Sequence, residues 1–217
     1  MKTKFLLIIV IAILLFTGCA KIHEKECNET ESETQVIHVE MDQVIYEDYA
    51  DLYNSADLVV RAHCIGNIES KLEYEYDGNY QKDVLVFAIT SADFKIDEIY
   101  KGLTDDDLIK ISQCYGVEES TGNLVMYSDL TEFNEDDEWI YFLSWDSNYE
   151  TYFACGDYTG RYSTADISIM ENIVNSNDYS DDDARIAGVW NKNLISIEMY
   201  KAVFENLLQN SPEVKYD

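Results

Sequence analysis

The chain has 217 residues, of which 47% are hydrophobic, so it is long enough for one globular domain with its own core. It carries 43 acidic and 15 basic side chains, which gives a formal net charge of −28. Such a surface repels phosphate backbones, which argues against nucleic acid as a partner and leaves cationic partners or divalent metal ions open.

The first 18 residues have the form of a secretory signal peptide. Two lysines make a basic head, residues 5–16 are an unbroken apolar run, and two small residues precede Cys19. The run is shorter than the roughly 20 residues that a membrane-spanning helix needs. The ending Phe-Thr-Gly-Cys resembles the lipobox of bacterial lipoproteins, in which the cysteine becomes the lipid-bearing N-terminus. We therefore predict that residues 1–18 are removed and that Cys19 carries acyl chains such as palmitate, which anchor the protein on the extracytoplasmic face of the cell membrane.

A polar segment and a helix are expected next. Residues 19–41 are mostly charged and polar, which predicts a flexible tether between the membrane and a single domain at residues 42–217. That domain is expected to begin with a helix, with Asp42 as its N-cap, because apolar residues recur at helical spacing from Ile45 to Ala56.

Alternating and β-branched segments then predict a mainly β domain. The expected strands are residues 57–68, 71–76, 84–100, 108–115, 138–145, 151–155 and 161–163. The sequence Asp77-Gly78-Asn79 predicts a hairpin turn, and the strand at residues 84–100 is long enough to bend and serve two sheets.

The last part of the chain is expected to be partly helical. Residues 166–176 fit either a helix or a strand, and residues 177–188 are expected to form an acidic loop. An apolar stripe after Ser196 predicts an amphipathic C-terminal helix at residues 196–210.

Five or six of these strands, one of them long and bent, with a helix at each end predict a small Greek-key barrel of the OB type. The segments 56–62 and 94–102, the strand at 108–113 and the later strand 139–143 are similar to the netrin-like domain, the OB barrel of tissue inhibitors of metalloproteinases. The same order resembles small lipoproteins of Gram-positive bacteria. In the inhibitors a free N-terminal cysteine next to the barrel coordinates the zinc of the protease. A lipidated Cys19 behind a tether has no such role, so the resemblance, which covers about residues 55–160, implies the fold and not protease inhibition.

Four further cysteines lie in a chain that is expected to be exported, where disulfides can form. No Cys-x-x-Cys pair is present, which argues against a zinc ribbon or a redox site. Cys27 is either free or paired with Cys64, and Cys64 would also fit as a buried thiol on an apolar strand face. If one bridge forms, the favoured pair is Cys114 and Cys155, since both lie at predicted strand ends.

Acidic side chains cluster in several predicted loops. The candidate for a weak Ca²⁺ site comprises Asp178, Asp181, Asp182 and Asp183. Calcium loops usually alternate acidic residues and contain a glycine, and this segment has neither feature, so a solvated loop is the preferred interpretation.

Reactive constellations are not apparent in the sequence. His63 is the one histidine expected inside the domain, and its strand position favours a structural role. No nucleophile motif, phosphate-binding glycine loop or metalloprotease motif is present. With 43 acidic residues, a carboxylate pair that suits glycoside hydrolysis cannot be picked out. No catalytic residue is predicted.

Tyrosines surround the predicted hairpin turn. Tyr74, Tyr76 and Tyr80 would serve a contact surface, because tyrosine combines a rigid ring with a hydroxyl, although packing is the commoner role of such residues. The leading hypothesis is a lipid-anchored extracellular domain that binds a protein or a wall-associated ligand without catalysis. The alternatives are a cation- or solute-binding lipoprotein that uses the acidic loops, and a secreted hydrolase.

Overall fold

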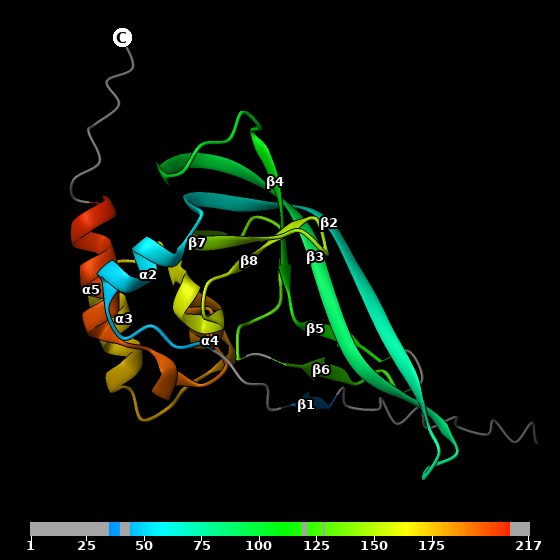
Figure 1. The fold of residues 1–217 in the computed structure, drawn as a ribbon. Helices are drawn as coiled ribbons and strands as arrows, with labels where there is room; N and C mark the ends of the chain where they lie inside the picture. Colours follow the sequence, from blue (N-terminus) through cyan, green and yellow to red (C-terminus); the bar gives the residue numbers. More distant parts are fainter. Residues whose placement is uncertain (1–34, 40–43, 119–120, 128, 209–217) are drawn as a thin grey trace, which may run out of the picture. The chain divides into compact units, whose positions relative to one another are not determined.

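Two β-sheets and a group of helices make up the structure, a computed structural model (Figure 1). It describes residues 35–39, 44–118, 121–127 and 129–208, which belong to the compact unit Thr34–Asp217. The fold is mainly β with additional helices, as predicted. The predicted signal peptide, Cys19 and Cys27 lie outside the described residues, as does the tether before residue 35.

The larger sheet has six strands in the order β2-β3-β4-β8-β7-β9, and β2 also pairs with β7. The pairing of β4 with β8 is parallel and the other pairings are antiparallel. Following the pairs therefore leads from β2 through β3, β4, β8 and β7 back to β2. The strands are β2 (Leu58–Asp77), β3 (Lys82–Lys101), β4 (Leu108–Gln113), β7 (Glu138–Asp146), β8 (Thr151–Ala154) and β9 (Arg161–Ser163).

The smaller sheet has the order β1-β6-β5, with β1 (Val36–His38) parallel to β6 (Leu124–Met126) and β6 antiparallel to β5 (Tyr115–Val117). This sheet corrects two predictions. The compact unit begins at Thr34 rather than at residue 42, because β1 lies in the segment that was predicted to be tether. The strand expected at residues 108–115 is interrupted at Cys114, where the chain leaves one sheet for the other.

The helices gather on one side of the larger sheet (Figure 1). They are α2 (Tyr49–Ser55), α3 (Ile167–Asn175), α4 (Asp181–Ala187) and α5 (Ile197–Val203), with short turns η1 (Asp157–Gly160) and η2 (Lys192–Leu194) and a π-helical end, η3 (Phe204–Leu208). Ser196 caps α5 as predicted, since its hydroxyl accepts the Met199 N–H.

Local hydrogen bonds correct the other helix predictions. The first helix begins after Asp48, not Asp42, because the Asp48 carboxylate accepts the N–H groups of the first turn. The ambiguous segment at residues 166–176 is helical. The expected acidic loop contains α4, because Ser180 and Asp183 form a capping box that satisfies the first N–H groups of the helix.

Lys101, at the end of β3, fixes the C-terminal end of α2. Its ammonium group donates to the carbonyls of Tyr53, Asn54 and Ala56 at 2.5, 3.1 and 2.6 Å, and it lies 5.1 Å from the centre of the Tyr53 ring. A cation at this position satisfies carbonyls that the helix leaves open and interacts favourably with the helix dipole.

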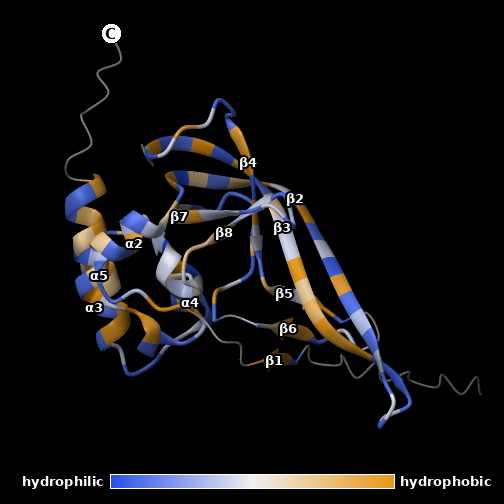
Figure 2. Ribbon diagram, viewed as in Figure 1, coloured by the Kyte–Doolittle hydropathy of each residue, from blue (hydrophilic) through white to orange (hydrophobic). Residues whose placement is uncertain are grey.

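Three apolar clusters form the core. The first packs the helices on the sheet around Phe142, whose ring makes edge contacts with Tyr49 and Tyr162 at 6.1 and 5.8 Å. The second lies among the strands of the larger sheet around Phe94 and Tyr141. The third lies between the β2–β3 hairpin and the smaller sheet, and Figure 2 shows hydrophobic residues along this part of β3.

A buried arginine joins four parts of the chain. Arg161 in β9 is 3% exposed, and its guanidinium donates to Gln113, to Thr131 and to the carbonyl of Gly188, which is the C-cap of α4. The guanidinium carbon lies 4.5 Å from the centre of the Trp139 ring. Arg161 therefore ties β4, β7 and β9 to α4.

Among the described residues, none of the helices combines the length and the hydrophobicity needed to span a bilayer.

Candidate functional site

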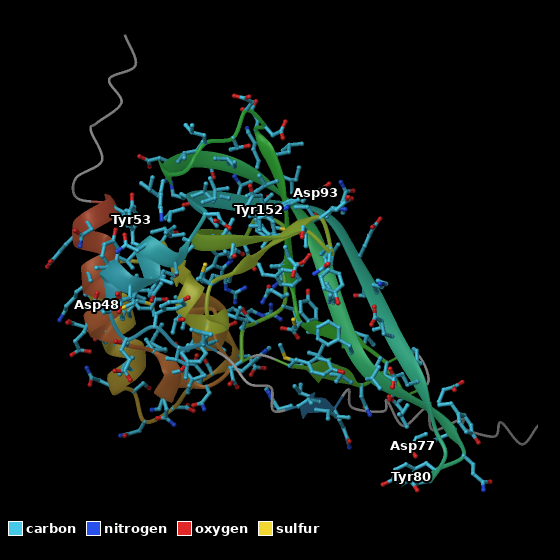
Figure 3. The ribbon with its side chains drawn as sticks, in the orientation of Figure 1. Asp48, Tyr53, Asp77, Tyr80, Asp93 and Tyr152 are labelled. Carbon is cyan, nitrogen blue, oxygen red and sulfur yellow. The ribbon has the colours of Figure 1, made fainter. Side chains whose placement is uncertain are left out.

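The far part of the β2–β3 hairpin is a two-stranded ribbon, here residues 71–89. The pairs of β2 with β7 end at His63, and those of β3 with β4 begin at Thr90. Within the described ranges, no third strand pairs with the ribbon. It extends away from the helices, and Figure 3 shows Asp77 and Tyr80 at its tip, far from Asp48 and Tyr53.

The ribbon is supported by the smaller sheet. Leu72, Leu85 and Phe87 pack against the third cluster, and the rings of Phe87 and Tyr127 are 5.3 Å apart. Gly116 in β5 permits a close approach, because a Cβ atom there would lie 2.6 Å from the Leu72 side chain. An isolated hairpin is at best marginally stable in water, so this contact holds the ribbon in one position.

The predicted turn is confirmed at the tip of the ribbon. The Asp77 carboxylate accepts the N–H groups of Asn79 and Tyr80 at 2.7 and 3.3 Å, which is the local bonding that favours aspartate in turns. This bonding fixes the backbone on which Tyr80 is presented.

The three tyrosines singled out in the sequence lie on this ribbon and are exposed. The exposed fractions are 43% for Tyr74, 66% for Tyr76 and 71% for Tyr80, while the core tyrosines Tyr115 and Tyr141 are at most 5% exposed. Most of the surface of Tyr76 and Tyr80 is therefore free of packing contacts, whereas somewhat more than half of Tyr74 is covered. They offer apolar rings and hydroxyl groups to a partner.

The acidic candidate residues are placed in and before α4. Asp181, Asp182 and Asp183 make the first turn of this helix, where negative charge is favourable. Asp183 accepts the N–H and the hydroxyl of Ser180 at 3.0 and 2.7 Å, and these bonds lower the pKa of its carboxyl. In the part of the chain that the structure describes, no group of three or more His, Cys, Asp or Glu side chains is arranged to hold a metal ion.

The cysteines do not form the predicted bridge. Cys155 is a free, buried thiol in the first cluster, whereas Cys114 packs against the third. The predicted Cys114–Cys155 disulfide is therefore wrong. Cys64 is a free, buried thiol in the second cluster, which agrees with the alternative prediction for it. Burial raises the pKa of Cys155 to about 11, so this thiol is protonated at neutral pH and is a poor nucleophile.

A histidine–carboxylate pair lies on the surface of the larger sheet. The Nδ1 atom of His63 is 2.7 Å from a carboxylate oxygen of Asp97, which lies on β3 two residues beyond Lys95, the register partner of His63. A hydrolytic triad also needs a nucleophile bonded to the other ring nitrogen. Across the described residues, His63 makes no hydrogen bond to a hydroxyl or a thiol.

Sequence reasoning missed a cavity between the helices and β9. Its volume is about 210 Å³, and Tyr158, Tyr162, Met199 and Tyr200 are among the residues that line it. Burial raises the pKa of Tyr200 to about 12, so its phenol is neutral at physiological pH and does not act as a base. The phenol oxygen accepts the Ser163 N–H, and its O–H donates to the Ala187 carbonyl, so Tyr200 serves the packing of α5.

The chain was compared with family models and with curated proteins, and neither comparison gave a match.

Proposed function

We propose that the protein is a lipid-anchored, extracytoplasmic binding domain that recognises a protein or a wall-associated ligand through the β2–β3 ribbon and carries out no catalysis. The observation that carries this proposal is the exposure of Tyr74, Tyr76 and Tyr80 on a ribbon that the smaller sheet supports.

The ribbon has the physical properties of a contact surface. Tyrosine side chains lose little conformational entropy on binding and are enriched among the residues that dominate binding energy. The ribbon is held by the third cluster and by the turn at Asp77, so little backbone has to be ordered when a partner binds. A docked partner would bury rings that are at least 43% exposed in the free protein.

We also infer that the larger sheet is an OB-like barrel. The support is the closed circuit of strand pairs: β2, β3, β4, β8 and β7 pair in this order, and β7 pairs with β2 again. Within this circuit only β4 and β8 are parallel neighbours. The OB fold is a five-stranded Greek-key barrel of this kind. The second cluster, which includes Phe94 and Tyr141, would then be the interior of the barrel.

The anchor is tested at Cys19. In cells that express the full chain, labelled palmitate is expected to be incorporated into the wild type and lost in Cys19→Ala, because the thiol is the site of acylation. The variant should also move from the membrane fraction to a form that salt or buffer releases. Cys27→Ala is the matched control and should keep both the label and the membrane attachment. Labelling that persists in Cys19→Ala would overturn the anchor and leave the ribbon proposal standing.

The ribbon is tested by photo-crosslinking on intact cells. A photoreactive phenylalanine derivative placed at Tyr76 or Tyr80 in the full chain should give one discrete adduct, because a bound partner covers these side chains. Ile169 on α3, which is 41% exposed, is the control position and should give no such adduct.

A second variant separates loss of contact from loss of fold. In this variant the photoreactive residue is placed at a fourth ribbon position, Asn79, and the triple change Tyr74→Ala, Tyr76→Ala and Tyr80→Ala should remove the adduct. The melting temperature should change little, since exposed substitutions usually cost less than about 0.5 kcal/mol each. If the adduct is unchanged in the triple variant, or if Ile169 gives the same adduct, the ribbon is not the binding surface.

A further inference from the structure

A groove of about 340 Å³ lies between the loop that joins β3 to β4 and the turn that joins β7 to β8. The residues that line it include Leu108, Trp145 and Tyr152 and the acidic residues Asp106 and Glu150. Figure 3 shows Tyr152 well away from Tyr80, so this groove is separate from the tip of the ribbon.

The groove has an aromatic wall that is open to solvent. Trp145 is 48% exposed, while the other tryptophan of β7, Trp139, is 4% exposed. The rings of Trp145 and Tyr152 meet edge to face, with centres 5.0 Å apart and planes at 68°. Tyr152 thus packs against the indole, while about half of the surface of Trp145 stays open to solvent.

The backbone of Trp145 is held in place from the start of β2. The carboxylate of Asp57 accepts the Trp145 N–H at 2.9 Å and also contacts the Ser144 hydroxyl at 3.4 Å. The indole is therefore carried by a fixed strand rather than by a free loop, which lowers the entropy cost of binding.

The charges around the aromatic wall are mostly negative. Burial is the main cause of the raised pKa of Tyr152, and the carboxylates of Asp57 and Asp106 raise it further. Lys110 is the one cation in the lining, against Asp106 and Glu150, and the chain as a whole has a formal charge of −28. An anion would be repelled, whereas a cation would be attracted to the carboxylates and to the face of the indole.

From this geometry we infer that the groove binds a small organic cation through its ammonium group, with Trp145 as the principal contact and Asp106 and Glu150 as the neighbouring charges. An ammonium group within about 6 Å of an indole face is stabilised by the ring quadrupole, and tryptophan gives the strongest such interaction. A neutral molecule of the same shape would gain only the apolar contact.

The test uses two probes of matched shape, choline and its uncharged isostere 3,3-dimethylbutan-1-ol. The full-length protein is titrated with each while the indole N–H resonances are followed, and Trp145→Phe identifies the signal of Trp145. The Kd of choline, obtained from the shift of this signal, is expected to be at least about tenfold lower than the Kd of the isostere. Added salt should weaken choline binding, because exposed charges are screened.

Variants then assign the contacts. For these, choline affinity is measured by saturation transfer to its methyl protons, because this signal does not depend on an indole in the protein. Trp145→Ala should weaken choline binding about three- to tenfold, and Trp145→Phe should restore most of it. Asp106→Asn should weaken binding at low salt, whereas Asp178→Asn, a matched loss of charge before α4, should not. Equal affinity for the isostere, unchanged binding in Trp145→Ala, or no choline binding at all would each overturn the proposal.

Discussion

Replacing Arg161 by methionine is expected to lower the free energy of unfolding by about 3–5 kcal/mol, because several buried neutral acceptors lose their donor and each unsatisfied group costs about 1–3 kcal/mol. Methionine fills much of the same volume but donates no hydrogen bond. The acceptors on Gln113, Thr131 and Gly188 would lose the guanidinium donors that they share in the core. Urea unfolding followed by circular dichroism measures the change.

Arg61 provides the matched control for Arg161. It lies on β2, its side chain is 35% exposed, and its ion pairs with Glu98 and Glu138 are 3.7 and 3.6 Å long. Arg61→Met should cost less than about 1 kcal/mol, because exposed ion pairs contribute little.

Within the described ranges Arg161 forms no ion pair with a carboxylate, so its burial also carries a desolvation cost. If Arg161→Met lowers the free energy of unfolding by less than about 1 kcal/mol, the desolvation cost of the guanidinium cancels the stabilisation from its hydrogen bonds, which would contradict the prediction. If the methionine variant does not fold, Arg161→Lys keeps the charge and should still be less stable than the wild type.

The second large effect is expected at Phe142, where alanine should lower the free energy of unfolding by about 3–5 kcal/mol. Phe142 is fully buried on β7, and its ring contacts Tyr49 from the first helix and Tyr162 from β9. Removing the ring leaves a cavity at the junction of helices and sheet. The same unfolding measurement applies.

Phe153 on β8 is the control for Phe142. Its ring contacts Tyr149 in the β7–β8 turn at 6.0 Å, and it is only partly buried. Phe153→Ala should therefore cost clearly less than Phe142→Ala. Equal losses at the two positions would argue against the helix–sheet packing around Phe142.

The parts of the fold that the sequence predicted are those with strong local signals. The strands of the long hairpin alternate in polarity, the Asp77-Gly78 turn has the bonding that such turns use, and Ser196 caps α5. These features depend on residues close together in the chain, so the pattern alone identifies them.

The missed elements depend on contacts between distant residues. Strand β1 is only three residues long, and it is a strand because β6 lies beside it. The capping box of Ser180 and Asp183 is a local signal that was present in the sequence, but the run of aspartates was interpreted as a loop. The role of Arg161 could not be predicted, because its partners Gln113, Thr131, Trp139 and Gly188 come from four separate segments. The groove at Trp145 could not be predicted either, because its walls come from two segments, 104–110 and 145–152, that only the folded sheet brings together.

The ribbon is the central claim, and hydrogen exchange tests it most directly. The full-length protein is mixed with the detergent-solubilised envelope of the cells that express it, and amide exchange is compared with that of the protein alone. Exchange is expected to slow in residues 71–89 and to be unchanged in α3 and α4. Unchanged exchange in residues 71–89, with slowing confined to another part of the domain, would contradict the assignment of the ribbon as the binding surface.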